Sequence, residues 1–112
     1  MNLEEIIQKL NLSVLTIPNN FASIQPEGGY CADLLSCVMA GAKPGTLWVT
    51  LQAHINIVAV AALTDCAAII ITEGATPEPD VVAKANNQSV TLLGSKLNSY
   101  QVVCQLSDLG IR

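Results

Sequence analysis

The sequence predicts an α/β fold, a three-layer α/β/α arrangement around a parallel or mostly parallel sheet of four to five strands. The main indication is the stretch 47–74, in which two apolar runs, 47–51 and 67–72, flank an apolar segment over 55–63. Both runs are apolar at consecutive positions, as expected for parallel strands covered on both faces. With short links between them, they form a compact βαβ unit. The middle segment has no polar side, so we expect cover on its outer face as well.

The N-terminal part adds a helix and a strand. Apolar residues at i, i+3, i+4 and i+7 predict an amphipathic helix over 3–10, and Asn2 with Glu5 fits a capping box. The β-branched residues of 13–17 predict a strand. A turn follows at Pro18, and the pattern over 21–25 leaves an extended segment open.

The next segment contains two glycines and an aspartate. The run 26–29 (Pro-Glu-Gly-Gly) predicts a tight turn, which we favour over a backbone approach of Gly28-Gly29 to a phosphate. A short strand over 30–32 leads to Asp33, the expected N-cap of a helix over 34–42. Its buried stripe is expected to contain Leu34, Leu35, Val38, Met39 and Ala42.

The C-terminal part repeats the alternation of helix and strand. Prolines and acids in 76–80 predict a helix start, and a strand is expected over 90–93. Asn98 or Ser99 is the expected cap of a last helix, which should bury Val102, Val103, Leu106 and Leu109. We therefore expect one domain over 1–112, with helices on both faces of the sheet.

The composition restricts the possible partners. Hydrophobic residues make up 51% and charged residues only 12%, compared with roughly 25% charged residues in ordinary domains. This favours a homo-oligomer, most simply a dimer, over a monomer coated with Asn, Gln, Ser and Thr. The net charge is −4 and the five basic residues are scattered, which argues against nucleic-acid binding.

Membrane insertion and export also find no support in the sequence. The apolar stretch 53–72 is interrupted by polar residues, including Asp65, and an aspartate is costly at the centre of a membrane span. The first ten residues are amphipathic and acidic, unlike a signal peptide. We expect a cytoplasmic protein that does not associate with membranes.

The four cysteines and one histidine do not have the spacing of a zinc site. We expect no metal and no cofactor, and cysteines that act as small buried hydrophobes. A redox pair of Cys31 and Cys37 is a weaker alternative.

Residues 28–109 resemble the DRTGG domain, in particular small stand-alone bacterial proteins related to the N-terminal domain of HPr serine kinase/phosphorylase. The similarity is carried by Asp33-Leu34-Leu35-Ser36, by the spacing Trp48…Thr50…His54…Asn56 leading into Val58-Ala59-Val60-Ala61, and by Ile69-Ile70-Ile71-Thr72 followed by Gly74 and Pro77. The resemblance implies a regulatory or ligand-sensing domain, of a class often attached to CBS domains or enzymes.

Two departures from the family limit what the resemblance implies. The five-residue string that names the family is absent, and Glu73-Gly74 stands where such sequences often have paired glycines. The chain also has no G-x-x-x-x-G-K-[ST] loop, so no phosphate cradle for ATP is predicted. The resemblance therefore does not imply kinase activity.

The candidate site lies at the carboxyl edge of the expected sheet, where open α/β sheets usually bind ligands. Thr50, His54 and Asn56 follow one central strand and could direct donors at an anion on the next helix. The structural alternative is that His54 or Asn56 only caps that helix. The next strand ends in Thr72, Glu73 and Gly74, on the same edge if the two strands are parallel.

The resemblance, the absent ATP loop and the candidate residues lead to three hypotheses about function. The leading hypothesis is a non-catalytic regulatory module that binds a small anionic or nucleotide-like ligand, or a partner protein. The first alternative is an interaction adaptor without a small-molecule ligand. The second is a small enzyme that uses His54 and Glu73 as an acid–base pair, although no nucleophile stands out.

Overall fold

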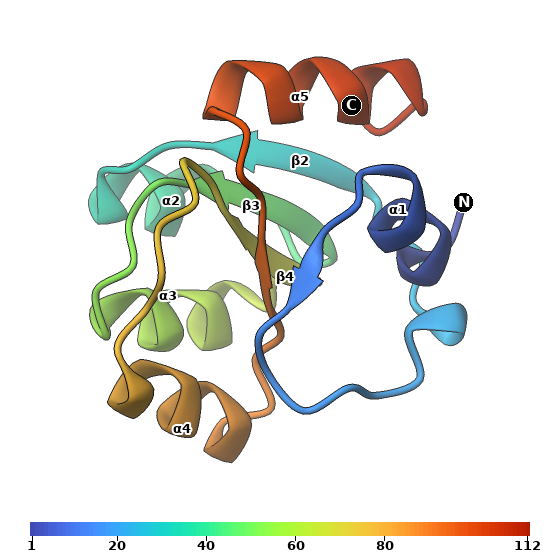
Figure 1. Ribbon diagram of the computed structural model, residues 1–112. Coiled ribbons are helices and arrows are strands. Elements are labelled where there is room, and N and C mark those ends of the chain that lie inside the picture. Colours follow the sequence, from blue (N-terminus) through green and yellow to red (C-terminus); the bar gives the residue numbers. More distant parts are fainter.

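The computed structural model describes all 112 residues and alternates helices with short strands (Figure 1). The elements in chain order are α1 (Leu3–Lys9), β1 (Ser13–Val14), the 3₁₀ helix η1 (Phe21–Ser23), β2 (Gly28–Cys31), α2 (Leu35–Gly41), β3 (Thr46–Thr50), α3 (Asn56–Thr64), β4 (Ala68–Ile71), α4 (Pro79–Asn87), β5 (Leu92–Gly94) and α5 (Ser99–Asp108).

The five strands form one sheet in the order β1-β5-β4-β3-β2. All neighbours are parallel except β1, which pairs antiparallel with β5 at one edge. In the centre, Val49 of β3 lies opposite Ile70 of β4. The predicted mostly parallel sheet is therefore confirmed, with five strands.

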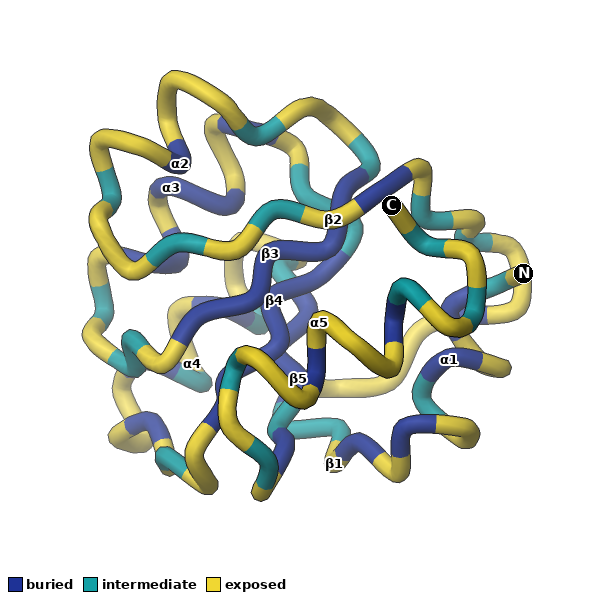
Figure 2. Tube along the Cα trace, turned by 90° about the horizontal axis from the view of Figure 1, so that it is seen from above, coloured by how far each residue is buried: buried dark blue, intermediate teal, exposed yellow.

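Helices cover both faces of the sheet and enclose two cores. On one face, α1 and α5 pack on the strands through residues such as Ile6 and Leu106. On the other face, α2, α3 and α4 cover Trp48 and its neighbours. Figure 2 shows the buried strands running through the middle of the molecule. This confirms the three-layer α/β/α class.

Two helix starts follow the sequence closely because their caps are local. The Asn2 side chain accepts from the Glu5 amide at 2.9 Å, and Glu5 returns a bond to the Asn2 amide. The Asn98 side chain accepts from the Gln101 amide at 2.8 Å and forms the same kind of box. Each box satisfies two amides at a helix end.

The segment before β3 differs from the prediction. The chain forms a 3₁₀ turn at Phe21–Ser23 in place of an extended segment. The predicted turn over 26–29 is wrong, because Gly28 and Gly29 already belong to β2 and pair with β3. A Cβ added at Gly28 would lie 2.6 Å from the carbonyl oxygen of Arg112. The glycine thus allows the C-terminal backbone to approach the strand closely.

Asp33 is not the helix cap that we predicted. Helix α2 has Leu34 at its N-cap position, without a side-chain cap bond. The Asp33 carboxylate instead accepts from the Thr50 hydroxyl at 2.8 Å and from the Leu51 amide at 2.9 Å. The buried side of α2 is also narrower than predicted, since Val38 is buried whereas Leu34 and Met39 are exposed.

The outer sides of two further helices are open to solvent. In α3, Ala59 and Ala62 are exposed and the Leu63 side chain is 73% exposed, although α2 and α4 contact this helix on either side. In α5, Val103 is exposed, contrary to the prediction, while Val102 and Leu106 are buried. No helix combines the length and the apolar composition that crossing a membrane would require.

Candidate ligand-binding site

The connections of the sheet diverge at one place along its carboxyl edge. From β2 to β4, each parallel strand is followed by a helix on the same face, namely α2, α3 and α4. After β5 the chain crosses to the other face and forms α5. The loops that leave the neighbouring strands β4 and β5 therefore run to opposite faces. We call this place the switch point: the order of the parallel strands does not reverse there, but diverging loops leave a crevice at the carboxyl ends of the strands, where open α/β sheets bind ligands.

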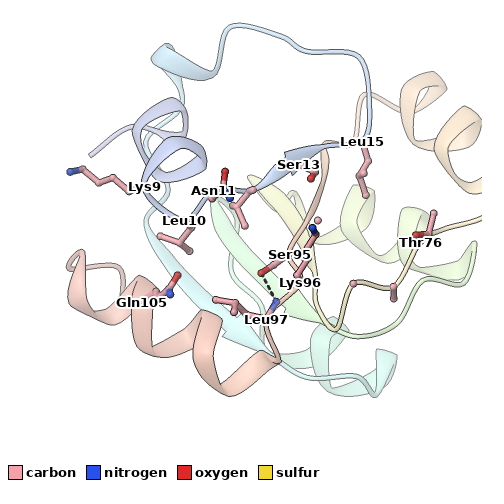
Figure 3. A pocket seen from close by; sticks show the side chains of 14 residues that line it. Lys9, Leu10, Asn11, Ser13, Leu15, Thr76, Ser95, Lys96, Leu97 and Gln105 are labelled. Carbon is pink, nitrogen blue, oxygen red and sulfur yellow. Dashed lines mark hydrogen bonds between the residues drawn. The ribbon is translucent and has the colours of Figure 1, made fainter.

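A cavity of about 690 Å³ lies at this switch point. Its volume is within the range of small-molecule sites, about 300–1,000 Å³. Three segments line it: the end of α1 with the following loop and β1, the loop after β4, and the loop after β5 with part of α5 (Figure 3). The lining residues are Lys9, Leu10, Asn11, Leu12, Ser13, Leu15, Gly74, Ala75, Thr76, Gly94, Ser95, Lys96, Leu97 and Gln105. We call it the switch-point pocket.

Hydrogen bonds between the two diverging loops form the base of this pocket. The Glu73 amide donates to the Leu97 carbonyl and the Gly74 amide to the Ser95 carbonyl, both at 2.8 Å. Glu73 and Gly74 both have a left-handed backbone, with φ of 64° and 63°. This conformation is unfavourable for a glutamate and is often found at functional sites.

The third wall of the pocket comes from the chain between α1 and β1. Asn11 has a φ of 52° and turns the chain out of the helix. Ser13 of β1 then pairs with Gly94 of β5. Because this pair is antiparallel, the start of β1 lies beside the end of β5, and the preceding loop lies beside the loop that begins at Ser95.

The charges of the pocket differ from those of the whole chain. The protein has nine acidic and five basic residues, yet the lining contains Lys9 and Lys96 and no Asp or Glu. In Figure 3, Lys96 lies between Ser95 and Leu97 within the pocket wall, whereas the Lys9 ammonium points outward from the end of α1. The local excess of positive charge favours an anion.

Unpaired donors accompany these charges. The backbone N–H groups of Thr76 and Lys96 make no hydrogen bond within the protein. In the core, by contrast, every buried side-chain nitrogen and oxygen atom has a partner. Thr76 and Lys96 are exposed residues of the pocket lining, so their amides are open to solvent and available to a ligand.

Two of the six residues predicted as site residues have hydroxyls that are already engaged. Thr50 is fully buried, and its hydroxyl donates to Asp33 and accepts from the Gln52 amide at 3.0 Å. Thr72 is fully buried too, and its hydroxyl bonds to Ser99 at 2.8 Å. The Thr72 amide donates to the Thr50 carbonyl at 2.9 Å, so the two threonines end neighbouring strands as expected.

His54 and Asn56 lie at the start of α3. His54 Nδ1 accepts from the Asn56 amide at 3.2 Å, and the His54 carbonyl accepts from the Ile57 amide at 3.1 Å. The His54 side chain thus satisfies one amide at the start of α3, in line with the structural alternative, although the N-cap position itself is Ile55 and makes no side-chain bond. Both side chains are exposed, and no hydrogen bond joins His54 to Glu73.

Glu73 and Gly74 are exposed in the loop after β4, and Gly74 is the one residue of the predicted set that lines the switch-point pocket. Sequence reasoning missed the other lining residues. Ser95 and Lys96 had a usable signal, since they follow an expected strand and precede the Asn98 cap. Lys9 and Asn11 had none, because their position depends on the pairing of β1 with β5.

The cysteines are all free thiols, and three of the four are exposed, so they are less buried than predicted. Burial, with a smaller contribution from the Asp33 carboxylate, raises the pKa of the Cys31 thiol. A thiol with a raised pKa stays protonated at neutral pH and is a poor nucleophile. His, Cys, Asp and Glu side chains form no group of three or more that could hold a metal ion.

A smaller cavity of about 330 Å³ lies between β2 and the end of α5, with mostly apolar walls. None of the six predicted site residues lines it. Its walls include Tyr30, Val103 and Ile111.

Comparison with known proteins identifies a family and a fold. The family model for the DRTGG domain matches residues 30–109. A comparison with curated protein sequences finds no significant match. Among solved structures, the chain is similar to the crystal structure of the CBS and DRTGG domains of the regulatory region of Clostridium perfringens pyrophosphatase, complexed with its activator diadenosine tetraphosphate.

The alignment with that structure has a TM-score of 0.78 at 16% sequence identity. It covers 94% of this chain and 45% of the other, so this chain spans less than half of the pyrophosphatase fragment. At this identity the likeness concerns the fold. The family match covers most of the chain and agrees with the resemblance seen in the sequence: this protein belongs to the DRTGG domain family.

Proposed function

We propose that this protein is a non-catalytic regulatory module that senses a small anionic or nucleotide-like ligand. The observation that carries the proposal is a pocket at the switch point whose lining residues include Lys9 and Lys96 and no acid. Two further findings support it: the chain belongs to the DRTGG family, and a protein of similar fold is part of a regulatory region that was crystallised with a nucleotide activator.

We also propose that residues 1–112 form one DRTGG-like domain, and that this domain is related to the N-terminal domain of HPr serine kinase/phosphorylase. Ligand binding along the carboxyl edge is proposed to involve Thr50, His54, Asn56, Thr72, Glu73 and Gly74. Gly74 has the strongest support among them, because it lines the pocket. A catalytic pair of His54 and Glu73 has less support, since His54 Nδ1 already accepts from the Asn56 amide.

A protein partner is the second candidate, and exposed apolar side chains favour it. Leu34, Met39, Leu51 and Leu63 are each 48% exposed or more, and they lie in or beside the contacting helices α2 and α3. We propose that this face binds a second copy of the chain and forms a dimer. The four free thiols fit a reducing compartment, which supports a cytoplasmic location.

Ligand sensing can be tested by thermal unfolding in the presence of nucleotides and phosphorylated metabolites. A ligand that binds only the folded state should raise the melting temperature as its concentration increases. At a ligand concentration of a hundred times Kd, it should increase the free energy of unfolding by about 2.7 kcal/mol. The corresponding nucleosides, which lack phosphate, serve as the uncharged control.

The opposite outcome is equally informative. If no nucleotide or metabolite raises the melting temperature, and a defined protein partner is recovered by pull-down, the adaptor function replaces ligand sensing.

A further inference from the structure

We infer that the switch-point pocket is the ligand site of this protein, and that it takes a phosphate-bearing small molecule with an apolar body. The inference rests on the proposed function and adds to it a location and a ligand class. Only Gly74 is shared with the residues predicted from the sequence.

The first argument concerns the two kinds of lining. Lys96, Ser95 and Thr76 offer a charged group, hydroxyls and the unpaired amides of Lys96 and Thr76. Four leucines at positions 10, 12, 15 and 97 provide an apolar wall in the same cavity. Ligand sites combine an apolar lining with a few converging polar groups in this way. A phosphorylated molecule with a base or another apolar body matches both parts.

The second argument concerns charge. Two of the five basic residues of the chain line the pocket, and none of its nine acids does. The protein as a whole has a net charge of −4. A lining with lysines and no acid is therefore more favourable for an anion than the average surface of the chain.

The third argument compares the switch-point pocket with the other end of the carboxyl edge. At the start of α3, the Asn56 amide is already bonded to His54 Nδ1, and the Thr50 hydroxyl is bonded to Asp33 and Gln52. Neither of the two cavities described above includes these residues. The amides of Ala53, His54 and Ile55 are free there as well, but only the switch-point pocket combines free amides with a cavity.

The fourth argument links the pocket to the rest of the molecule. The Glu73 and Gly74 amides bond the loop after β4 to the loop after β5, and Thr72 bonds to Ser99 at the start of α5. A ligand in contact with both loops stabilises α4 and α5 together, on opposite faces of the sheet. Binding at this place can therefore affect surfaces on both sides of the domain.

Calorimetric titration of the whole chain with ATP, inorganic pyrophosphate and adenosine tests the site. We expect ATP to bind most tightly, pyrophosphate more weakly because it lacks the apolar body, and adenosine least because it lacks the charge. Lys96→Glu should weaken ATP binding about tenfold or more. Lys43→Glu makes the same charge change at an exposed residue outside both cavities, and should change Kd less than about twofold.

The variants separate failure of the site from failure of the proposed function. If Lys43→Glu and Lys96→Glu weaken ATP binding equally, the effect is one of general charge and the proposed site is overturned. If Lys96→Glu leaves ATP binding unchanged, the site is also overturned, but ligand sensing survives. Absence of binding by both anions at about 5 mM would also overturn the site. The proposed function falls as well only if the thermal screen also finds no ligand.

Discussion

Asp33 joins the ends of two parallel strands through a single carboxylate oxygen. It follows β2, and its Oδ1 accepts from the Thr50 hydroxyl and the Leu51 amide at the end of β3. Because Thr50 is fully buried, its hydroxyl would lose its acceptor if the carboxylate were removed. The sequence indicated a polar role for Asp33 but assigned the wrong partner, since the helix start is adjacent in sequence and β3 is not.

We expect Asp33→Ala to lower the free energy of unfolding by about 1–2 kcal/mol, because two hydrogen bonds to a charged acceptor are lost. Thr50→Val should have a similar effect. In the double variant the losses should not add, since both remove the same interaction. Urea unfolding measures all three, with Asp108→Ala as an exposed control that lacks a side-chain hydrogen bond. Strictly additive losses would show that the two residues act independently.

At the scale of the elements, the accuracy of the sequence predictions follows the range of the contacts that define each element. The caps Asn2 and Asn98 bond to residues three positions on, and both were predicted. At the start of β2, by contrast, Gly28 pairs with Thr46 of β3 and lies beside the Arg112 backbone, and no local pattern reveals either contact. The same holds for the end of α2, where Gly41 lies against a side chain of β2.

Helix α2 is attached to β2 by Tyr30. The Tyr30 hydroxyl donates to the Cys37 carbonyl at 3.0 Å, and a Cβ added at Gly41 would lie 2.7 Å from the Tyr30 ring. Alanine normally stabilises a helix by about 0.5–1 kcal/mol relative to glycine. We expect the opposite for Gly41→Ala, because the ring has to move and its hydrogen bond is strained.

Urea unfolding of Gly41→Ala, Tyr30→Leu and the double variant checks this expectation. The smaller leucine should remove the clash, so alanine should regain its normal helix preference in the double variant. A Gly41→Ala protein that is more stable than the native chain would show that the contact with Tyr30 is not restrictive.

At the scale of the whole molecule, the fold class and the mostly parallel sheet were predictable, because the apolar runs of the strands and the apolar periodicity of the helices are visible in the sequence. The position of the pocket was not. It depends on α5 covering the face opposite to α4, and an amphipathic helix such as α5, with Val102 and Leu106 buried, could pack on either face. The predicted site was therefore placed between the ends of β3 and β4, whereas the pocket lies between the ends of β4 and β5.

Self-association follows from the exposed apolar side chains of α2 and α3. We expect light scattering at micromolar concentration to give the mass of a dimer for the native chain. Ala59→Glu or Ala40→Glu should give a folded monomer, since a typical interface buries about 800 Å² per subunit and excludes an unpaired charge. Ala22→Glu, at an exposed position in η1, is the control and should stay dimeric. A monomeric native chain would refute the proposed dimer.

The most direct measurement of the proposed ligand site is amide chemical-shift mapping during titration with ATP. We expect the largest shifts at the amides of 74–76 and 94–97, with smaller ones at 9–13, because these three segments line the switch-point pocket. Shifts concentrated at 51–56, with the pocket amides unchanged, would instead place the ligand at the start of α3 and contradict the assignment made here.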